Sequence, residues 1–490
     1  MDLNKLAALG CCSWYFNKKS KKSFDTKEKG SLQQSQQSDL KARRKQFGIC
    51  LKCGQTLTDY KYCQSCSSKE FQSKFKNWTS GNEHIDDFIQ YSQLNAKSKQ
   101  SYLLWIPYDD LIDIKYLANG GFTSVYSGTW DHFETGELVD VVLKRLHNGQ
   151  ISNPEFLKEQ VSIFLYGASN NGNIVKCYGF TKHPTEGYML VLEFAQDGDL
   201  RSFLRKQYSS LLWSDKLSIL REISKSLDLL HSHEFVHGDL HTGNVLKRQL
   251  NDQTLSSRIM KNKKKNSNYR NTREIILDLP LYFDNNSITA SPYGVIPYVA
   301  PEVFEKGYYT KQSDIYSFGI IMWELSTDQP PFFDYTNDKE LVNDIRNDIR
   351  PEIDDQQIPK CVADLMQRCW DPEPINRPSA KTVTSIIDEW IWILSATKIR
   401  LSNKSKDLLN QFSSANTSSK KKVKRQSKLP LSLSRTPTML RNNNYYSKPL
   451  SKYLTIMDVE KSANASSFSS SFSSTESVNT VNHRQQKDYY

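Results

Sequence analysis

One short polar segment restricts what this 490-residue chain can fold into more than any other feature. Residues 235–246 read FVHGDLHTGNVL and follow a stretch, 214–233, in which apolar residues recur every three or four positions. That spacing predicts an amphipathic helix. His237, Asp239 and Asn244 therefore stand at fixed intervals just beyond a helix end. We interpret the segment as a loop that carries chemistry, because chance is a poor explanation for these residue types in this order.

The segment separates two regions with different hydrophobic patterns. Before it, β-branched and aromatic residues alternate between turn signals, which predicts five strands and a helix that begins near Asn153–Pro154. The expected strands are 111–117, 124–130, 138–146, 174–180 and 187–195. After it, the helical period predicts helices at 313–326, 340–350, 362–370 and 382–394. The expected fold is α+β, with a β-rich lobe followed by a helical lobe.

The β-rich region carries a lysine that is placed for a role inside a cleft. Lys144 ends the run VVLK on the third expected strand, where alternating apolar residues would hold its stem. Glu159 on the following expected helix is its natural ion-pair partner, and Glu155 competes one turn earlier. An ordinary solvated lysine is the plainer alternative. Between the first two strands, LANGGFTSV at 117–125 predicts a hairpin of small residues.

Further motifs follow in order, and together they resemble the protein kinases. Asp278 closes the apolar run IILD, and YVAPE at 298–302, SDIYSFG at 313–319 and NRP at 376–378 come after it. With the segments around Lys144 and Asp239, these motifs keep the family's order. The chain looks like the tyrosine-kinase-like branch, and NWTSGN, LNAK and WIPYD ahead of the first strand resemble a large set of fungal kinases.

The resemblance implies a bilobal kinase fold that binds ATP and Mg²⁺ and transfers the γ-phosphoryl group to protein Ser/Thr hydroxyls, with Tyr as the alternative acceptor. It makes Asp239 the proton acceptor, and Asn244 and Asp278 ligands of magnesium. Lys144 would hold the α- and β-phosphates, with Glu159 as its partner. The positions that the resemblance assigns to nucleotide binding are Leu117, Ala118, Gly120, Val125, Lys144 and, after a gatekeeper Leu192, the backbone of Glu193 and Ala195.

The resemblance also implies two structural devices in the helical lobe. Glu302 and Arg377 would form a buried ion pair that braces the activation segment, and Asp314 would brace the backbone of the catalytic loop. A buried pair of this kind is retained because the loss of one partner leaves an uncompensated charge.

The chain departs from the family's pattern at several positions. Gly238 stands where an arginine usually precedes the catalytic aspartate, so no cation there can pair with a phosphorylated activation loop. His241 replaces a lysine, Val295 replaces a threonine, and Pro280 replaces a glycine and removes an N–H. Of the glycine-loop positions, only Gly120 fits well. An alternative therefore stays open, in which the chain is a pseudokinase scaffold that binds nucleotide or partners without turnover.

Cys50-x-x-Cys53 and Cys63-x-x-Cys66 form a separate pattern. A short hairpin between the pairs would bring four thiolates around one tetrahedral Zn²⁺, and such a small module needs its metal to fold. Structural or redox thiols are the plainer alternative, whereas nine cysteines leave one unpaired and disfavour a disulfide framework. A third hypothesis is a zinc-knuckle binder of nucleic acid or ubiquitin with an idle kinase domain.

The formal net charge of +11 is concentrated in three polar segments. Residues 1–49, 247–273 and 401–490 carry +7, +8 and +10, which leaves the rest of the chain at −14. Solvated linkers explain such segments better than nucleic-acid contacts do, so no specific nucleic acid is expected. We interpret 247–273 as a basic insertion in a strand connection, and we expect its part 261–273, KNKKKNSNYRNTR, to be an exposed loop.

No apolar stretch is long enough for a transmembrane helix. We expect a cytoplasmic protein with protein substrates as its partners. Cys11 and Cys12 beside several lysines are a less favoured candidate for an acylated peripheral anchor, and KKKVKR at 420–425 leaves nuclear entry as an alternative. The expected organisation is a disordered basic segment 1–45, a zinc knuckle 46–71, a connector 72–107, a kinase domain 108–396 and a disordered Ser/Lys/Asn-rich tail 397–490.

Overall fold

The computed structural model describes residues 40–99, 101–119, 124–132, 136–146, 173–249, 273–279, 292–396, 402–426, 445 and 447–454. The chain divides into two compact units, Met1–Trp78 with Gln90–Tyr102 and Thr79–Ile89 with Leu103–Tyr490. Among the described residues, no helix has both the length and the apolar composition that crossing a membrane requires. The helix expected after Asn153–Pro154 lies outside the described residues, as do Cys11 and Cys12.

The first unit contains the two cysteine pairs and helix α3 (Gln64–Lys74), which is followed by a 3-10 turn, η2 (Phe75–Asn77). Isolated bridges join Ile49 to Thr56 and Asp59 to Tyr62, so the chain folds back on itself between the pairs. Gly54, directly after the second cysteine, has φ +75°, a left-handed conformation that favours glycine. The short hairpin that the sequence predicts is present.

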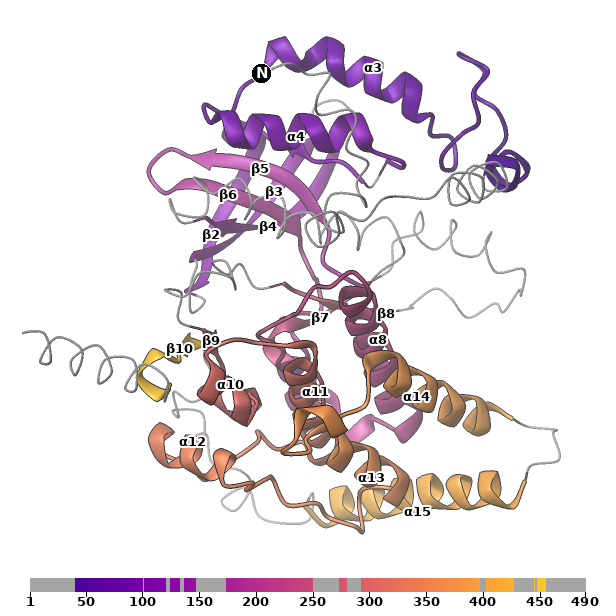
Figure 1. Ribbon diagram of the computed structural model, residues 1–490, viewed down its shortest axis with the longest axis vertical. Helices are drawn as coiled ribbons and strands as arrows, with labels where there is room; N and C mark the ends of the chain where they lie inside the picture. Colours follow the sequence, from indigo (N-terminus) through magenta and orange to yellow (C-terminus); the bar gives the residue numbers. More distant parts are fainter. Residues whose placement is uncertain are drawn as a thin grey trace, which may run out of the picture. The chain divides into compact units, whose positions relative to one another are not determined.

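Six strands form the main sheet of the second unit, in the order β1-β5-β6-β4-β3-β2 (Figure 1). Neighbouring strands are antiparallel except β1 and β5, which are parallel. All five strands expected from the sequence are present, although the one expected from 174 begins at Cys177. The bounds are β1 (Leu104–Trp105), β2 (Leu111–Asn119), β3 (Ser124–His132), β4 (Glu137–Arg145), β5 (Cys177–His183) and β6 (Gly187–Glu193).

Buried and less buried side chains alternate along β4, and this alternation determines the direction of the Lys144 side chain. Val141 and Leu143 are fully buried and pack with Trp130, Met189 and neighbouring residues in one hydrophobic cluster. Successive side chains of a strand point to opposite faces of its sheet. Lys144 therefore projects from the face opposite this cluster, while its backbone pairs with β3 and β6.

The connector expected at 72–107 contains regular structure. Strand β1 adds to the sheet beside β5, and a Cβ on Gly179 of β5 would meet the carbonyl oxygen of Leu104 at 1.9 Å. This close approach requires a glycine. Helix α4 (Glu83–Asn95) brings Phe88 against Phe180, with ring centroids 6.4 Å apart. The sheet of the kinase domain thus extends to residues ahead of its expected start.

The rest of the second unit is mostly helical, with α8 (Trp213–Ser232) and α11 (Lys311–Thr327) in its core. Every residue of α11 from Ser313 to Ser326 is buried, so its sequence shows no polar stripe. Helix α12 ends at Arg346, earlier than expected, and Asp348 shortly beyond it has φ +63°. Other described helices of this part are α7 (Leu200–Gln207), α10 (Pro301–Lys306), α12 (Asp338–Arg346), α13 (Lys360–Cys369) and α14 (Ala380–Ser395).

The structure corrects the expectation of a disordered tail at 397–490 for the parts of it that are described, which are 402–426, 445 and 447–454. Helix α15 spans Asn403–Gln426, and its Phe412 is 1% exposed because it packs against Trp213 and Trp390. Residues 447–454 are also ordered and include the short strand β10 (Lys448–Pro449), which pairs with β9 (Tyr293–Gly294). The run KKKVKR at 420–425 lies in the last turns of α15 and not in an extended chain.

The expected insertion joins two paired strands. Strands β7 (Val245–Gln249) and β8 (Arg273–Leu277) are antiparallel, with Val245 opposite Leu277. Residues 250–272 connect them and lie outside the described residues. Residues 247–249 and Arg273, which were expected within the insertion, belong to the two strands, so the connection between the strands is shorter than expected.

Candidate active site

Asp314 holds the backbone of the loop that carries Asp239. It lies in the first turn of α11, where Thr310 caps the helix, and is 1% exposed. Its carboxylate accepts the backbone N–H groups of His237 at 2.8 Å and Gly238 at 2.9 Å. Gly238 has φ +76°, which suits the glycine found there. The bracing role expected of Asp314 is confirmed.

Asp239 and Asn244 lie close together within this loop. Asn244 ends a 3-10 turn, η5 (Thr242–Asn244), and its Nδ2 donates to the carbonyl oxygen of Asp239 at 2.8 Å. The same nitrogen lies 3.4 Å from Oδ2 of Asp239, and Nε2 of His241 lies 3.6 Å from that oxygen. A carboxylate, an amide and an imidazole therefore meet at one point. The imidazole occupies the position where many Ser/Thr kinases have a lysine.

Lys144 and Asp278 form an ion pair across the site. Lys144 Nζ donates to both carboxylate oxygens of Asp278, at 2.6 and 2.7 Å, and the two side chains are 13% and 15% exposed. Asp278 follows the end of β8, and its backbone N–H donates to the carbonyl oxygen of Asn244 at 2.9 Å. The structure thus brings Lys144, Asn244 and Asp278 together from three different strands or turns.

His237 links the two carboxylate-bearing segments. Its Nε2 donates to the carbonyl oxygen of Asp278 at 3.1 Å, and its Nδ1 accepts the backbone N–H of Asp239 at 3.3 Å. Burial lowers the pKa of His237 below its ordinary value. A neutral ring with its proton on Nε2 satisfies both hydrogen bonds, so His237 acts as a structural link.

The residues expected to contact nucleotide come from β2, β3 and the end of β6. Ala118 of β2 pairs with Val125 of β3, and Leu117 is half exposed. The gatekeeper Leu192 is 1% exposed. Glu193 and Ala195 follow it, while Gly120 and Glu159 lie outside the described residues.

Arg248 of β7 binds the side chain of Glu193, a contact that the sequence did not predict. Its guanidinium lies 2.6 Å from Oε2 of Glu193 and 2.9 Å from Oε2 of Glu274. Arg248 and Glu274 are opposite one another in the β7–β8 pair. Opposite charges at facing positions of two strands, such as Arg248 and Glu274, stabilise their pairing. The sequence does not show that these two residues face each other, because the long insertion conceals which residues of the two strands pair.

A second cluster that the sequence did not predict surrounds Tyr298 of the YVAPE motif. Arg201 of α7 donates to Oγ1 of Thr242 and to the hydroxyl of Tyr298, each at 3.2 Å, and lies 3.7 Å from Glu324. The Tyr298 hydroxyl donates to Glu324, and burial raises the pKa of Tyr298 well above its ordinary value. One arginine thereby connects the catalytic loop, the YVAPE segment and α11.

The expected ion pair between Glu302 and Arg377 is confirmed. Arg377 Nη1 and Nη2 donate to the two carboxylate oxygens of Glu302 at 2.6 and 2.9 Å. The side chains are 0% and 6% exposed for Arg377 and Glu302. Arg377 also donates to the carbonyl oxygen of Gln312 at 3.0 Å, which ties the NRP motif to the start of α11.

In the first unit, the four cysteines cluster in a geometry that suits a metal. Their sulfur atoms all lie within 4.8 Å of one another, with 3.8 Å between Cys50 and Cys66 and 3.5 Å between Cys53 and Cys63. Sulfurs around a tetrahedral zinc with Zn–S bonds of about 2.3 Å stand about 3.8 Å apart. The backbone N–H groups of Cys53 and Lys52 lower the pKa of Cys50 to about 7. The donor set fits a structural zinc ion.

Comparison with known proteins agrees with this geometry. Residues 111–387 match the family described as protein tyrosine and serine/threonine kinase. The chain is 26% identical to the probable serine/threonine-protein kinase roco7 of Dictyostelium discoideum over 287 residues, which cover 57% of this chain and 10% of that protein. It is 28% identical to the probable serine/threonine-protein kinase gdt2 of the same organism over 279 residues, 56% of this chain and 15% of that protein.

A human protein is similar to the same degree. The chain is 27% identical to the tyrosine-protein kinase TXK of Homo sapiens over 310 residues, which cover 61% of this chain and 53% of that protein. The chain thus spans between 10% and 53% of the length of these three relatives. The family match covers more than half of the chain, includes Lys144, Asp239, Asn244 and Asp278, and coincides with the two-lobed fold. The chain belongs to the protein tyrosine and serine/threonine kinase family.

Proposed function

We propose that this chain is an active protein kinase of the tyrosine-kinase-like branch, which transfers the γ-phosphoryl group of ATP to Ser or Thr hydroxyls of protein substrates. The observation that carries the proposal is the meeting of Asp239 and Asn244 with the Lys144–Asp278 pair. Two of the three relatives described above are named as serine/threonine kinases and one as a tyrosine kinase. That balance favours Ser/Thr acceptors.

The residues present fit magnesium and ATP. The carboxylate of Asp278 and the amide oxygen of Asn244 are hard oxygen ligands, and a backbone hydrogen bond holds the two residues side by side. Bound ATP-magnesium supplies the phosphoryl group and a positive charge beside it. Lys144 then offsets negative charge on the phosphates. The small exposed fractions of Lys144 and Asp278 keep these interactions out of bulk water.

Asp239 receives the proton of the acceptor hydroxyl in this proposal. Its carboxylate is 7% exposed, and its loop is held by Asp314 and by the amide of Asn244. A positioned general base accelerates a reaction about 10²- to 10⁴-fold. The rigid anchoring supplies orientation, which is the larger part of what a kinase contributes to phosphoryl transfer.

A pseudokinase scaffold is the second candidate, and one observation favours it. Both oxygens of Asp278 are bound to Lys144, so a magnesium ion would have to compete with this ammonium group. Pro280 in place of a glycine and the glycine loop in which only Gly120 fits well point in the same direction. A pseudokinase of this kind binds ATP analogues yet transfers no phosphate.

A peptide array with radiolabelled ATP separates these candidates. Purified full-length protein is incubated with matched peptides that differ only in a Ser, Thr or Tyr acceptor, beside an Asp239→Asn variant. Label on Ser and Thr peptides that the variant abolishes supports the proposal. Label on Tyr peptides alone corrects the acceptor class. Nucleotide binding by calorimetry without any label on peptide or protein establishes the scaffold instead.

We further propose that Cys50, Cys53, Cys63 and Cys66 bind one structural zinc ion in the first unit. The support is the cluster of four sulfurs together with the tight turn at Gly54. The module has few buried apolar side chains, so metal coordination would supply much of its stability.

A further inference from the structure

A short segment late in the chain pairs with strand β9, which lies just ahead of the YVAPE motif. We call residues 445 and 447–454 the tail segment. Its strand β10 pairs antiparallel with β9, and the backbone N–H of Leu450 donates to the carbonyl oxygen of Pro292 at 2.8 Å. Leu450 is 0% exposed, and Tyr453 and Leu454 are 8% exposed. Figure 1 draws β10 beside β9 and next to α10.

Side chains hold the tail segment at two further points. Lys448 Nζ donates to Oδ2 of Asp338 in α12 at 2.7 Å, and the Tyr453 hydroxyl donates to the same oxygen at 2.8 Å. The Tyr445 hydroxyl donates to the carbonyl oxygen of Pro331 at 2.8 Å. Both tyrosine hydroxyls are therefore bound to the helical lobe.

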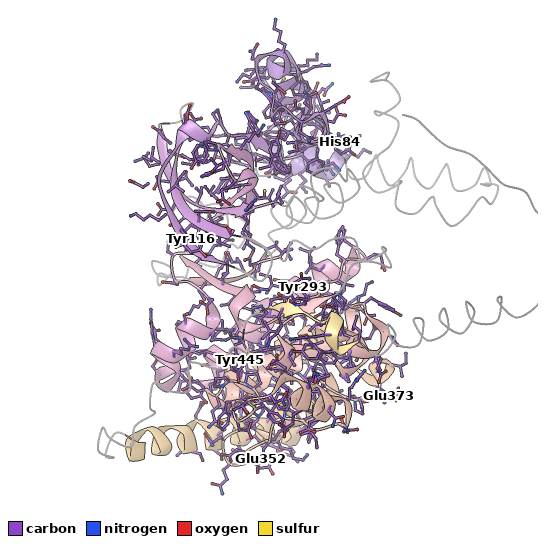
Figure 2. All side chains as sticks on the ribbon, turned by 90° about the vertical axis from the view of Figure 1, so that its left-hand side faces the viewer. His84, Tyr116, Tyr293, Glu352, Glu373 and Tyr445 are labelled. Atoms are coloured by element: carbon purple, nitrogen blue, oxygen red, sulfur yellow. The ribbon has the colours of Figure 1, made fainter. Side chains whose placement is uncertain are left out.

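The tail segment and the catalytic loop contact the same arginine. Arg201 donates to Thr242, three residues after Asp239 in the catalytic loop, and also to the carbonyl oxygen of Tyr445 at 3.2 Å. Strand β9 leads directly into the segment that ends at Tyr298, which contacts the same arginine. Figure 2 labels Tyr293 and Tyr445, both within the helical lobe.

Strand β9 offers main-chain groups to an extended peptide. Adding a strand to an available edge is a general way to recognise peptides, since main-chain hydrogen bonds give affinity and neighbouring pockets give specificity. A protein substrate needs an extended stretch beside the catalytic loop so that its hydroxyl reaches Asp239. The tail segment already uses β9, Arg201 and Asp338 in this way.

We propose that the tail segment is a tethered competitor of protein substrates for the surface beside the catalytic loop. The inference rests on the proposed kinase function. Because the competitor is part of the same chain, its effective concentration at this surface does not depend on the concentration of the protein. A substrate then binds only when the tail segment leaves, so removal of its anchors lowers the KM for the peptide and leaves the KM for ATP unchanged.

Three full-length variants test the proposal. Leu450→Asp places a charge at the fully buried position, and Lys448→Glu reverses the charge that faces Asp338. Lys452→Glu is the matched control, because it makes the same charge reversal at an exposed residue of the same segment. Steady-state kinetics with the best peptide from the array should show that Leu450→Asp and Lys448→Glu lower the peptide KM about tenfold. Lys452→Glu should resemble the parent.

A binding measurement separates failure of this proposal from failure of the kinase function. Fluorescein-labelled synthetic peptide 443–456 is titrated into each protein and followed by anisotropy, which needs no turnover. It should bind the Leu450→Asp protein and be excluded from the parent. Equal peptide KM values together with no binding to either variant overturn the proposal. Binding without phosphate transfer in any protein keeps the docking surface and rejects the kinase function. If Leu450→Asp lowers the melting temperature, its kinetics reflect a damaged fold, and the Lys448→Glu variant alone is used to judge the proposal.

Discussion

Lys144 of β4 holds both carboxylate oxygens of Asp278, 134 positions further along the chain, at 2.6 and 2.7 Å. Both side chains are mostly buried, so each charge depends on the other for its compensation. The pair also connects the sheet to the end of β8, where the backbone of Asp278 meets Asn244. A ligand that carries phosphate and magnesium would separate this ion pair, because its phosphates would attract Lys144 and its magnesium would attract Asp278.

Replacing Lys144 with methionine should weaken nucleotide binding and phosphate transfer together. Methionine keeps the length of the stem and removes the ammonium group, which leaves Asp278 without a cation in a largely buried place. We expect at least about a tenfold loss in kcat/KM, which corresponds to about 1.4 kcal/mol. Steady-state kinetics and calorimetric ATP titration measure it. Unchanged kinetics would show that another lysine serves the phosphates.

Asp239→Asn should abolish transfer with little effect on folding. The substitution preserves size and removes the carboxylate that we propose as the proton acceptor, so the expected loss in kcat is about 10²- to 10⁴-fold. Thermal unfolding and ATP binding should stay near the parent values. A variant that transfers phosphate at the parent rate would remove Asp239 from its assigned role.

Zinc should co-purify with the protein at about one ion per chain, and mass spectrometry of the metal content measures this. Each change of Cys50, Cys53, Cys63 or Cys66 to serine should lower the content, because each removes one of four ligands. Cys361→Ser is the control, since Cys361 lies outside the cluster. A full zinc complement in the Cys63→Ser protein would contradict the assignment.

Arg377→Met should destabilise the kinase domain strongly. The substitution leaves the buried carboxylate of Glu302 without its partner, and such losses cost about 3–5 kcal/mol. Chemical denaturation measures the change. The exposed Lys360–Asp364 pair provides the control, and Lys360→Met should leave the midpoint where it is. Equal midpoints for the Arg377→Met variant and the parent would show that the pair is not needed for stability.

The change in the domain's stability with pH should depend on Lys216, which lies in α8 and is 3% exposed. Burial lowers the pKa of Lys216 to about 7, and its Nζ donates to the Tyr208 hydroxyl at 3.0 Å. Between pH 7 and the ordinary lysine pKa, the unfolded chain binds a proton that the folded chain lacks, so stability rises with pH. From pH 7 to 9 this contribution is about 2 kcal/mol.

Lys216→Met should remove that rise. Denaturation curves at pH 7 and pH 9 for the parent and the variant give the difference directly. Lys225→Met, a less buried position on the same helix, should keep the pH dependence of the parent. A parent whose stability is flat over this range, or a variant that keeps the slope, would contradict the lowered pKa.

The sequence predicted the elements whose patterns are local. Strands and helices of the two lobes follow from alternation and from the helical period, and the loop around Asp239 follows from residue types at fixed spacing. Asp314 and the Glu302–Arg377 pair were expected through the family resemblance. Each of these features can be read from a short motif in a single sequence.

The sequence did not predict the parts that depend on distant partners. Helix α15 has Leu408, Phe412 and Ala415 on one face, a helical spacing that was there to be found, but the surrounding Ser, Asn and Lys residues resemble a disordered tail. Strand β10 has two residues, and its partner β9 is 155 positions earlier. Arg248 pairs with Glu193 only because β7 lies close to the end of β6. No local pattern encodes such contacts.

The pairing of β7 with β8 has a consequence for protein engineering. Val245 opposite Leu277 fixes the positions of Asn244 and Asp278 on either side, regardless of how many residues connect the far ends at Gln249 and Arg273. Loop length has a small energetic cost, about 0.6 kcal/mol for each doubling. The connection between Gln249 and Arg273 can therefore accept foreign sequence, such as an affinity tag or a whole fluorescent domain, while Asn244 and Asp278 stay where they are.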